Sequence, residues 1–441
     1  MSKCENASQS KILVFATHKN PLAARISIAL AGAGFGVAAL TPCGHPVRQA
    51  RRIRHHFAYH TRSRLKSIIR AIDRWSPDLL ACADDGAVRD LQRVHQCVRA
   101  SGDKAGRRIV DLIELSLGPP ASFSLTRNKS DFLALAEREG LRCPKTVVIP
   151  ADRAFDSAQG GLSYPIMAKA DQSDGGRSVR IVRRPADLRA AVWELQTPCT
   201  WRGRRLFGVM LGSEVLGRFM LPLRRTISLQ EYIVGRPSNR AVVCWKGEVL
   251  AGISVEAVEV TYDHGPASVV RVIDHPEMTG ACERMVERLQ LSGFVGFDFI
   301  LDSANRAWLL EMNPRVTQTC HFALADGTNL AASLCAQMKR LPMRSRLVPV
   351  YRDLIALFPN EMLRSPSSKY LKFSRHDVPW DEPELVRCIL NQELRIGILR
   401  RTRMFLERHF PPIADALVRV GLVGARGGYS PPYLEDVTPP L

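Results

Sequence analysis

The chain has 441 residues, of which 46% are hydrophobic and 24% are charged, and its formal net charge is +19. Two or three folded domains are expected, because the chain is too long for one ordinary core and too apolar to be disordered. Its eleven cysteines contain no C-x-x-C pair, and no signal-peptide pattern or apolar run of the roughly 20 residues that span a bilayer is present, so a cytoplasmic protein with reduced thiols is expected.

Apolar strands and helical patterns alternate up to about residue 115. "KILVFA" is short, apolar and preceded by polar residues, which is typical of a buried strand in a parallel sheet. "PLAARISIALAGAG" has helical spacing, with Pro21 near its start and glycines at its end. This alternation predicts an open parallel sheet with helices on both faces. The expected elements are strand 11–16, helix 21–34, strand 36–40, helix 64–75 and strand 77–85.

Positive charge is concentrated in residues 1–110, which carry 19 Lys and Arg against seven Asp and Glu. The densest part, residues 48–70, could bind a polyanion. A solvated helix face is the better interpretation, because no aromatic interleaving, recognition-helix pattern or zinc-finger spacing accompanies the charge. We therefore expect no specific nucleic-acid partner.

Residues 116–340 are rich in strand patterns. A helix closed by Gly140 leads to a strand, and hairpin signals follow at Lys246-Gly247 and at residues 303–305. Antiparallel strands with few helices predict an α+β domain.

Residues 341–441 are rich in Pro and Arg, with a helical pattern over 384–409. Apolar residues at helical spacing, from Leu390 to Phe405, alternate there with arginines. Such a helix could lie on an anionic membrane surface. Packing against the rest of the protein, or against a sister subunit in a homo-oligomer, is the better interpretation.

The stretch "FVGFDFILDSANRAWLLEMNPRVTQ" places acids inside apolar strands. If 304–305 form a two-residue turn, Asp298 lies directly across from Glu311, and Asn313 shares the strand face of Glu311. Burying these groups without partners would be costly, and a hard cation such as Mg²⁺ would remove that cost. Arg315, just beyond, suits an anionic oxygen. The alternative is that these strand-end acids point into water, and the hairpin alone does not decide between the two.

Two further patterns suggest phosphate and base binding. Lys169 follows an apolar strand and precedes a loop that contains Gly175, Gly176 and Ser178. Small residues let backbone amides approach a phosphate, and the lysine supplies a positive charge; the P-loop motif is absent, so this signal is weak. "SLQEYIVG" (228–235) could form an adenine slot, although alone it reads as an edge strand.

Taken in their order along the chain, these elements resemble the ATP-grasp superfamily, specifically single-module relatives of the carbamoyl-phosphate synthase large subunit. The resemblance covers about residues 1–335, and E-M-N-P-R at 311–315 is its most specific part. It implies an α/β plus α+β architecture: a pre-grasp parallel-sheet domain at 1–115, an ATP-grasp domain at 116–340 whose two α+β subdomains clasp Mg-ATP, and a basic, partly helical extension at 341–441.

The resemblance also implies roles for individual residues. The ATP phosphates would be bound by Lys129, Lys169, Gly175, Gly176 and Ser178. The adenine pocket would be lined by Gln230, Glu231, Tyr232 and Ile233. One or two Mg²⁺, or alternatively Mn²⁺, would be bound by Asp298, Glu311 and Asn313. The transferred phosphoryl group would be held by Arg315, with Arg271 as a second candidate. Gln230 stands where an acid is usual, and no ribose-binding carboxylate follows Gly235.

The implied reaction is an ATP-dependent ligation. A small-molecule carboxylate attacks the γ-phosphorus, an acyl phosphate forms, and an amine displaces phosphate. Two other interpretations within the superfamily stay open: a carboxylating enzyme, and an ATP-binding regulatory protein without turnover.

Overall fold

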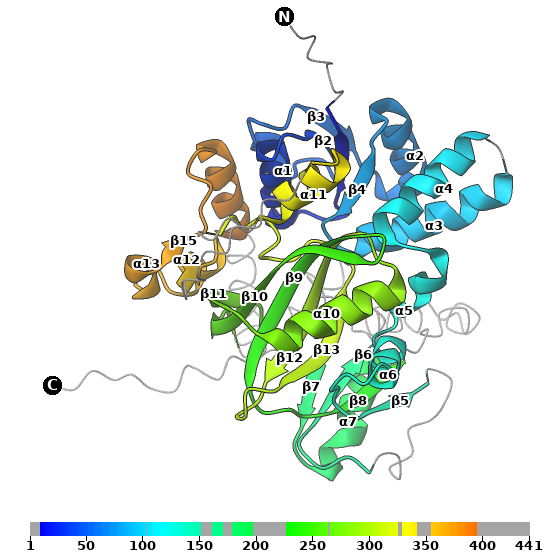
Figure 1. Cartoon of the computed structure of the whole chain (residues 1–441). Helices are drawn as coiled ribbons and strands as arrows, with labels where there is room; N and C mark the ends of the chain where they lie inside the picture. The colour runs from blue at the N-terminus through cyan, green and yellow to red at the C-terminus, as the bar shows by residue number, and fades with distance from the viewer. Residues whose placement is uncertain are drawn as a thin grey trace, which may run out of the picture. The chain divides into compact units, whose positions relative to one another are not determined.

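The computed structural model describes residues 9–102, 104–150, 161–170, 179–196, 226–262, 265–324, 329–341 and 354–394 (Figure 1). These residues form two compact units. The first takes in the described residues of Met1–Pro144, Ile233–Glu259 and Ala267–Leu390, and the second those of Lys145–Tyr232, Val260–Pro266 and Asn391–Leu441. The expected first domain, 1–115, therefore lies within a larger compact unit and does not end at a unit boundary.

The first unit begins with an open parallel sheet and its helices. The strands are β1 (Lys11–Phe15), β2 (Gly36–Thr41), β3 (His55–Ala58) and β4 (Leu79–Cys82), in the order β3-β2-β1-β4. The helices are α1 (Pro21–Gly32), η1 (Pro46–Gln49), η2 (Thr61–Ser63), α2 (Arg64–Trp75), α3 (Asp85–Ser101) and α4 (Lys104–Leu117). Ile12 and Val14 share a core with α1, whereas Leu13 and Phe15 share one with α2, α3 and α4. The predicted parallel sheet with helices on both faces is confirmed.

A long mixed sheet forms the rest of the first unit. Its strands are β9 (Arg236–Trp245), β10 (Glu248–Val260), β11 (Ala267–Ile273), β12 (Gly293–Leu301), β13 (Ala307–Asn313), β14 (Leu354–Ala356) and β15 (Arg375–His376). Their order is β13-β12-β9-β10-β11-β14-β15. The predicted β9–β10 turn is confirmed, since Lys246 and Gly247 both have positive φ, at 50° and 86°.

The two faces of this mixed sheet have different neighbours. One face packs against α6 (Lys129–Arg138) and α10 (Pro276–Leu289), and Figure 1 shows α10 lying across the strands. The other face shares a core with α1 and α11 (Leu330–Met338). The short helices η3 (Pro120–Ser122) and α5 (Phe123–Arg127) connect α4 to α6. One core thus joins the parallel sheet to the mixed sheet.

The second unit contains an antiparallel sheet with the order β5-β8-β6-β7. Its elements are β5 (Thr146–Ile149), β6 (Ile166–Ala170), β7 (Val179–Val182), β8 (Ile227–Glu231) and α7 (Pro185–Gln196). Leu188, Val192 and Leu195 of α7 pack on one face of this sheet.

The described part of the C-terminal region belongs to the first unit as far as Leu390. It contains α12 (Asn360–Arg364), α13 (Tyr370–Phe373) and a helical stretch at 383–394. Leu385 and Ile389 are buried in the core that contains α1, and Leu390 packs against it. Residues 384–390 of the predicted 384–409 helix therefore pack on the rest of the first unit, and residues 395–409 lie outside the described residues. No helix among the described residues is long and apolar enough to cross a bilayer.

His45, which precedes η1, should make the stability of the folded protein depend on pH. Its Nδ1 accepts a hydrogen bond from the backbone N–H of Val47 at 3.0 Å, and its side chain is buried. Burial, with nearby positive charge, lowers the pKa of His45 from 6.5 to about 3. Between these values the unfolded chain binds a proton that the folded protein does not, so stability falls as the pH falls, by about 1.4 kcal/mol per unit.

The His45→Asn variant should keep the cap and lose this pH dependence. Between pH 6.5 and pH 4.5, we expect its free energy of unfolding to fall by about 2 kcal/mol less than that of the wild type. Urea unfolding at a series of pH values measures the difference, with His60→Asn at an exposed histidine as the matched control. Equal pH dependence in wild type and His45→Asn would contradict the assignment.

Candidate functional site

The β12–β13 hairpin brings Asp298 and Glu311 opposite each other, as the sequence predicts, but through a different turn. The strands are joined by a loop of residues 302–306, not by a two-residue turn, and near the loop they pair one residue out of the predicted register. A bulge at Leu310 then shifts the register, so that Asp298 pairs with Glu311. Without the bulge, Glu311 would face the α10 side, because a one-residue slip exchanges the faces of a strand.

Asp298 lies between two asparagines on the face of the sheet opposite α10. Asn239 of β9 pairs with Asp298 in register, and its Nδ2 donates to Asp298 Oδ1 at 2.6 Å. Asn313 of β13 donates from Nδ2 to Asp298 Oδ2 at 2.9 Å. Each carboxylate oxygen therefore accepts one amide N–H, which fixes the orientation of this side chain.

Glu311 is paired with Lys129, the first residue of α6. The Lys129 Nζ lies 2.6 Å from Glu311 Oε2, and both side chains are half-buried. Burial alone would lower the pKa of Lys129, but the carboxylates of Glu311, Asp298 and Asp85 raise it above its usual value. Lys129 is therefore held as a cation at the carboxylate pair.

Arg315 connects this cluster to the parallel sheet. Its Nε donates to Asp85 Oδ2 at 2.9 Å, and its Nη2 donates to Asn313 Oδ1 at 3.1 Å. Asp85 is the first residue of α3 and follows β4, at the carboxyl end of a parallel strand, where ligand sites of such sheets lie. The arginine is thus oriented from two elements, and its guanidinium faces the same cluster as Asp298.

The donor set fits a hard divalent cation. Burial, followed by the neighbouring Glu311 charge, raises the pKa of Asp298 well above its usual range. A cation between Asp298 and Glu311 would relieve that repulsion, and carboxylate and amide oxygens are ligands that Mg²⁺ accepts. Within the described part of the chain no group of three or more His, Cys, Asp and Glu side chains forms a metal site, so two carboxylates and Asn313 would need other oxygens, such as phosphate, to complete a shell.

The structure does not bring Arg271 to this cluster. Its Nη1 donates to Glu256 Oε1 at 2.6 Å, and Arg236 binds the other oxygen of the same carboxylate at 2.9 Å. Glu256 pairs with Ser238 in register, whereas Asn239, the next residue, faces Asp298. Because successive residues of a strand face opposite sides, Glu256 and Arg271 lie on the face of the sheet that does not carry Asp298.

The second unit holds a separate polar group. Lys169 of β6 donates from Nζ to Gln230 Oε1 at 2.5 Å, and Gln230 Nε2 donates to Thr146 Oγ1 at 3.2 Å. A glutamine oxygen accepts this hydrogen bond and orients the lysine without carrying a negative charge.

Glu231 is the last residue of β8. The backbone N–H of Glu231 donates to Lys145 O at 2.9 Å, and Glu231 Oε2 accepts from Lys145 N at 3.2 Å. Tyr232 and Ile233 come directly after the strand. The expected phosphate loop, with Gly175, Gly176 and Ser178, lies outside the described residues.

Asn239 and Asp85 belong to the cluster and were not among the residues predicted for it. Asp85 had a signal, because the strand pattern at 77–85 ends in polar residues at the carboxyl end of a predicted parallel strand. Asn239 had none, because its role depends on the pairing of β9 with β12, which a single sequence does not reveal.

Comparison with known proteins identifies the fold. The family described as "ATP-grasp in the biosynthetic pathway with Ter operon" matches residues 229–355, which include Asp298, Glu311, Asn313 and Arg315. Carboxyaminoimidazole ribonucleotide synthase from Aspergillus clavatus, solved with ATP, superposes with a TM-score of 0.55 at 15% identity, over 78% of this chain and 80% of that one. Biotin carboxylase from Campylobacter jejuni gives 0.53 at 16% identity, over 76% and 72%. The chain has the ATP-grasp fold and contains an ATP-grasp domain.

Two curated proteins are similar to this chain in sequence. The carbamoyl phosphate synthase large chain of Xylella fastidiosa strain Temecula1 is 27% identical over 260 residues, which is 54% of this chain and 22% of that protein. The large chain of strain 9a5c is 26% identical over the same shares. This chain is therefore a weak homologue of the carbamoyl phosphate synthase large chain, and it spans about a fifth of the length of those relatives.

Proposed function

We propose that this protein is an ATP-dependent carboxylate–amine ligase. A substrate carboxylate would attack the γ-phosphorus of ATP, and the resulting acyl phosphate would react with an amine to release phosphate. The observation that carries the proposal is the convergence of Asp298, Glu311, Asn313 and Arg315, from the β12–β13 hairpin and the residues just after it, with Lys129 of α6, which is far away in the chain.

Each residue of this cluster suits one part of the reaction. Asp298, Glu311 and Asn313 would hold Mg²⁺, which would neutralise phosphate charge when bound. Lys129 would contact a phosphate oxygen beside Glu311. Arg315, oriented by Asp85, would bind the oxygens of the transferred phosphoryl group through its planar fork. No nucleophilic side chain is required, because positioning and charge neutralisation supply most of the catalysis.

Residues of β6, of β8 and of the segment after β8 would also bind the nucleotide. Lys169 would bind a phosphate, together with the loop that contains Gly175, Gly176 and Ser178. The adenine pocket would be formed by Gln230, Glu231, Tyr232 and Ile233. Arg271 is removed from the proposal, because its guanidinium pairs with Glu256 on the other face of the mixed sheet.

The experiment that tests the function is substrate-dependent formation of ADP. The purified chain is incubated with Mg-ATP and mixtures of organic acids and amines, and mixtures that give ADP are divided until one pair remains. ADP formed with an acid and an amine together supports the ligase, whereas ADP formed with bicarbonate and an acceptor supports the carboxylating alternative. ADP formation that Glu311→Gln leaves unchanged would contradict both.

Nucleotide-dependent stabilisation gives the second prediction. Mg²⁺ with ADP should raise the melting temperature of the wild type more than ADP alone, because the metal offsets the repulsion between Asp298 and Glu311 and joins them to the phosphates. At a tenfold excess of ligand over its Kd the added stability is about 1.4 kcal/mol. Differential scanning fluorimetry with and without Mg²⁺ measures the effect.

Three variants in the mixed sheet, two at the proposed metal site and one control, locate the effect. Asp298→Asn and Glu311→Gln should lose the Mg²⁺ increment, whereas Glu248→Gln, at an exposed glutamate beside the β9–β10 turn, should keep it. An increment of equal size in all three variants would place the metal elsewhere.

A further inference from the structure

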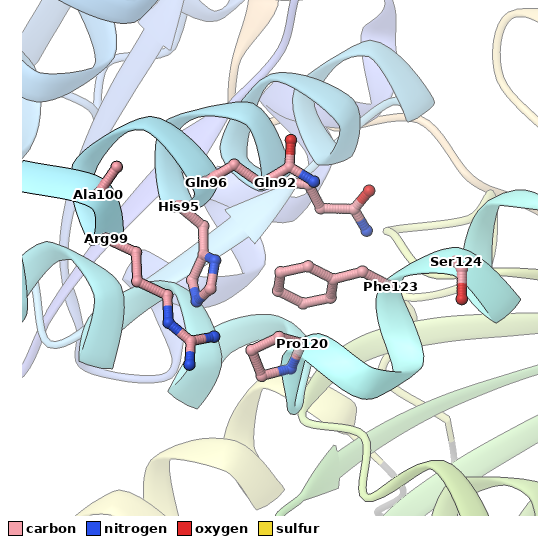
Figure 2. Close-up of a pocket in the computed structure, with 8 residues that line it drawn as sticks. All are labelled: Gln92, His95, Gln96, Arg99, Ala100, Pro120, Phe123 and Ser124. Atoms are coloured by element: carbon pink, nitrogen blue, oxygen red, sulfur yellow. The ribbon is translucent and has the colours of Figure 1, made fainter.

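A pocket of about 550 Å³ lies in the first unit between α3 and the segment formed by η3 and α5. Figure 2 shows its two walls: Gln92, His95, Gln96 and Arg99 follow one another along α3, opposite Pro120 and Phe123. None of these residues belongs to the cluster around Asp298. The volume is within the usual range for small-molecule sites.

The buried wall of the pocket contains a hydrogen-bond acceptor without a partner. Gln92 is 1% exposed, and its Oε1 is buried and accepts no hydrogen bond from the part of the chain that the structure describes. The orientation of the amide is fixed by its neighbours. Thr126 Oγ1 donates its single proton to Phe123 O at 3.0 Å, so it can only accept from Gln92 Nε2, at 3.3 Å. The carbonyl oxygen is therefore left for another donor, and a buried unpaired acceptor is costly. The oxygen is closed off from solvent in this structure, so a ligand in the pocket would reach it after a small shift of the Gln92 side chain.

The other groups define what would bind beside that acceptor. The ring of Phe123 meets His95 edge-on at 5.2 Å, and His95 Nε2 is bonded to Glu114 Oε1 at 2.7 Å, so the imidazole is held as a fixed wall. Arg99 is exposed, and its guanidinium forms no ion pair or hydrogen bond among the described residues. In Figure 2 this guanidinium extends toward Pro120, at one end of the pocket.

We propose that this pocket is an effector site for a flat, anionic small molecule with an N–H group. The N–H would donate to Gln92 Oε1, the ring would lie against Phe123 and Pro120, and the anionic group would pair with Arg99. These three features match the unpaired acceptor, the apolar wall and the cation that line the pocket.

Both walls of the pocket lead to the proposed ATP site. The helix that carries Gln92 and Arg99 begins at Asp85, which binds Arg315. The segment that carries Phe123 continues through α5 into α6, where Lys129 binds Glu311. A ligand that holds α3 and α5 together would therefore bear on both contacts. This coupling, unlike the pocket itself, rests on the proposed function.

Three matched probes test the site by isothermal titration calorimetry. Indole-2-carboxylate has a ring, a carboxylate and an N–H; 1-methylindole-2-carboxylate lacks the N–H, and indole lacks the carboxylate. We expect indole-2-carboxylate to bind at least about tenfold more tightly than either analogue, as for one lost polar contact. No binding of indole-2-carboxylate, or equal binding of all three, would overturn the proposal.

Two variants assign these preferences to residues. Gln92→Met should abolish the preference for the N–H, and Arg99→Gln should abolish the preference for the carboxylate. Arg93→Gln, at an exposed arginine on the same helix, should keep both preferences, and thermal unfolding checks that each variant is folded. Preferences that persist in Gln92→Met and Arg99→Gln would place the probe at another site.

The effector role is measured by the affinity for Mg-ADP with and without saturating probe. A change of at least about fivefold supports coupling. An unchanged affinity would overturn the effector role and leave the binding site standing. Absence of Mg-ADP binding under both conditions would instead contradict the proposed function, while the probe titration would still test the pocket.

Discussion

Replacing Glu311 with glutamine should lower ATP turnover at least about 100-fold while leaving the protein folded. Even groups that only support a metal ligand cost about 10–100-fold when removed, and Glu311 is proposed as a ligand itself. Glutamine keeps the shape but removes the charge that would hold Mg²⁺. Steady-state ADP formation measures the loss, and chemical unfolding measures stability.

The stability of Glu311→Gln should stay within about 1 kcal/mol of the wild type. The variant loses a half-buried ion pair with Lys129, but it also removes the Glu311 charge, which adds to burial in raising the pKa of Asp298. A large loss of stability together with the loss of turnover would mean that Glu311 is structural, and would leave the metal assignment without support.

Glu256→Gln is the matched variant on the other face of the same sheet. Glu256 is bonded to Arg236 and Arg271, and burial of its side chain is offset by these two guanidiniums, which lower its pKa. We expect this variant to lose about 1–3 kcal/mol of stability and to keep its activity at a temperature where it is folded. Opposite outcomes for the two glutamates would separate the functional face from the structural one.

The position of Glu311 shows how far the sequence alone could predict the site. Symmetry about residues 304–305 correctly predicts the pairing of Asp298 with Glu311, yet the loop spans 302–306 and the bulge at Leu310 restores the pairing. Asp302 stabilises the longer loop by accepting hydrogen bonds from the backbone N–H groups of Ala304 and Arg306. Local hydrogen bonds and a bulge compensate each other here, and neither leaves a pattern in the sequence.

The position of Arg271, unlike that of Glu311, could not be predicted from the sequence. The pattern of β11 predicts that Val270 and Val272 share one face and that Arg271 lies on the other, but it does not say which face meets the ligand. That choice depends on which strands flank β11 and on where α10 packs, and both are contacts between distant segments. Strands β1, β2 and β4 of the parallel sheet were predictable because their signals are local: short apolar strands, helical spacing and glycine stops. Strand β3 (His55–Ala58) was not predicted, because it lies in the basic stretch 48–70 that was interpreted as a helix face.

Replacing Phe297 with alanine should cause the largest loss of stability of any variant considered, about 3–5 kcal/mol. Phe297 is fully buried, and its ring lies 6.4 Å from that of Phe132 in the core shared by α6, α10 and the mixed sheet. Alanine removes the buried ring and leaves a cavity that rigid strands and helices fill poorly. Guanidinium unfolding measures the loss, and Phe373→Ala, at a side chain that is 83% exposed, should change stability by less than about 0.5 kcal/mol.

The same substitution should reduce turnover even where the protein is folded. Phe132 lies three residues after Lys129 on α6, and Phe297 directly precedes Asp298, so the two rings support both sides of the proposed phosphate site. A displacement of about 1 Å at a reacting group costs about 100-fold in rate. A double-mutant cycle with Phe132→Ala should give a coupling of about 0.5–1.5 kcal/mol. Additive losses of stability, or full turnover in folded Phe297→Ala, would mean that Lys129 is positioned by its ion pair with Glu311 and not by this core.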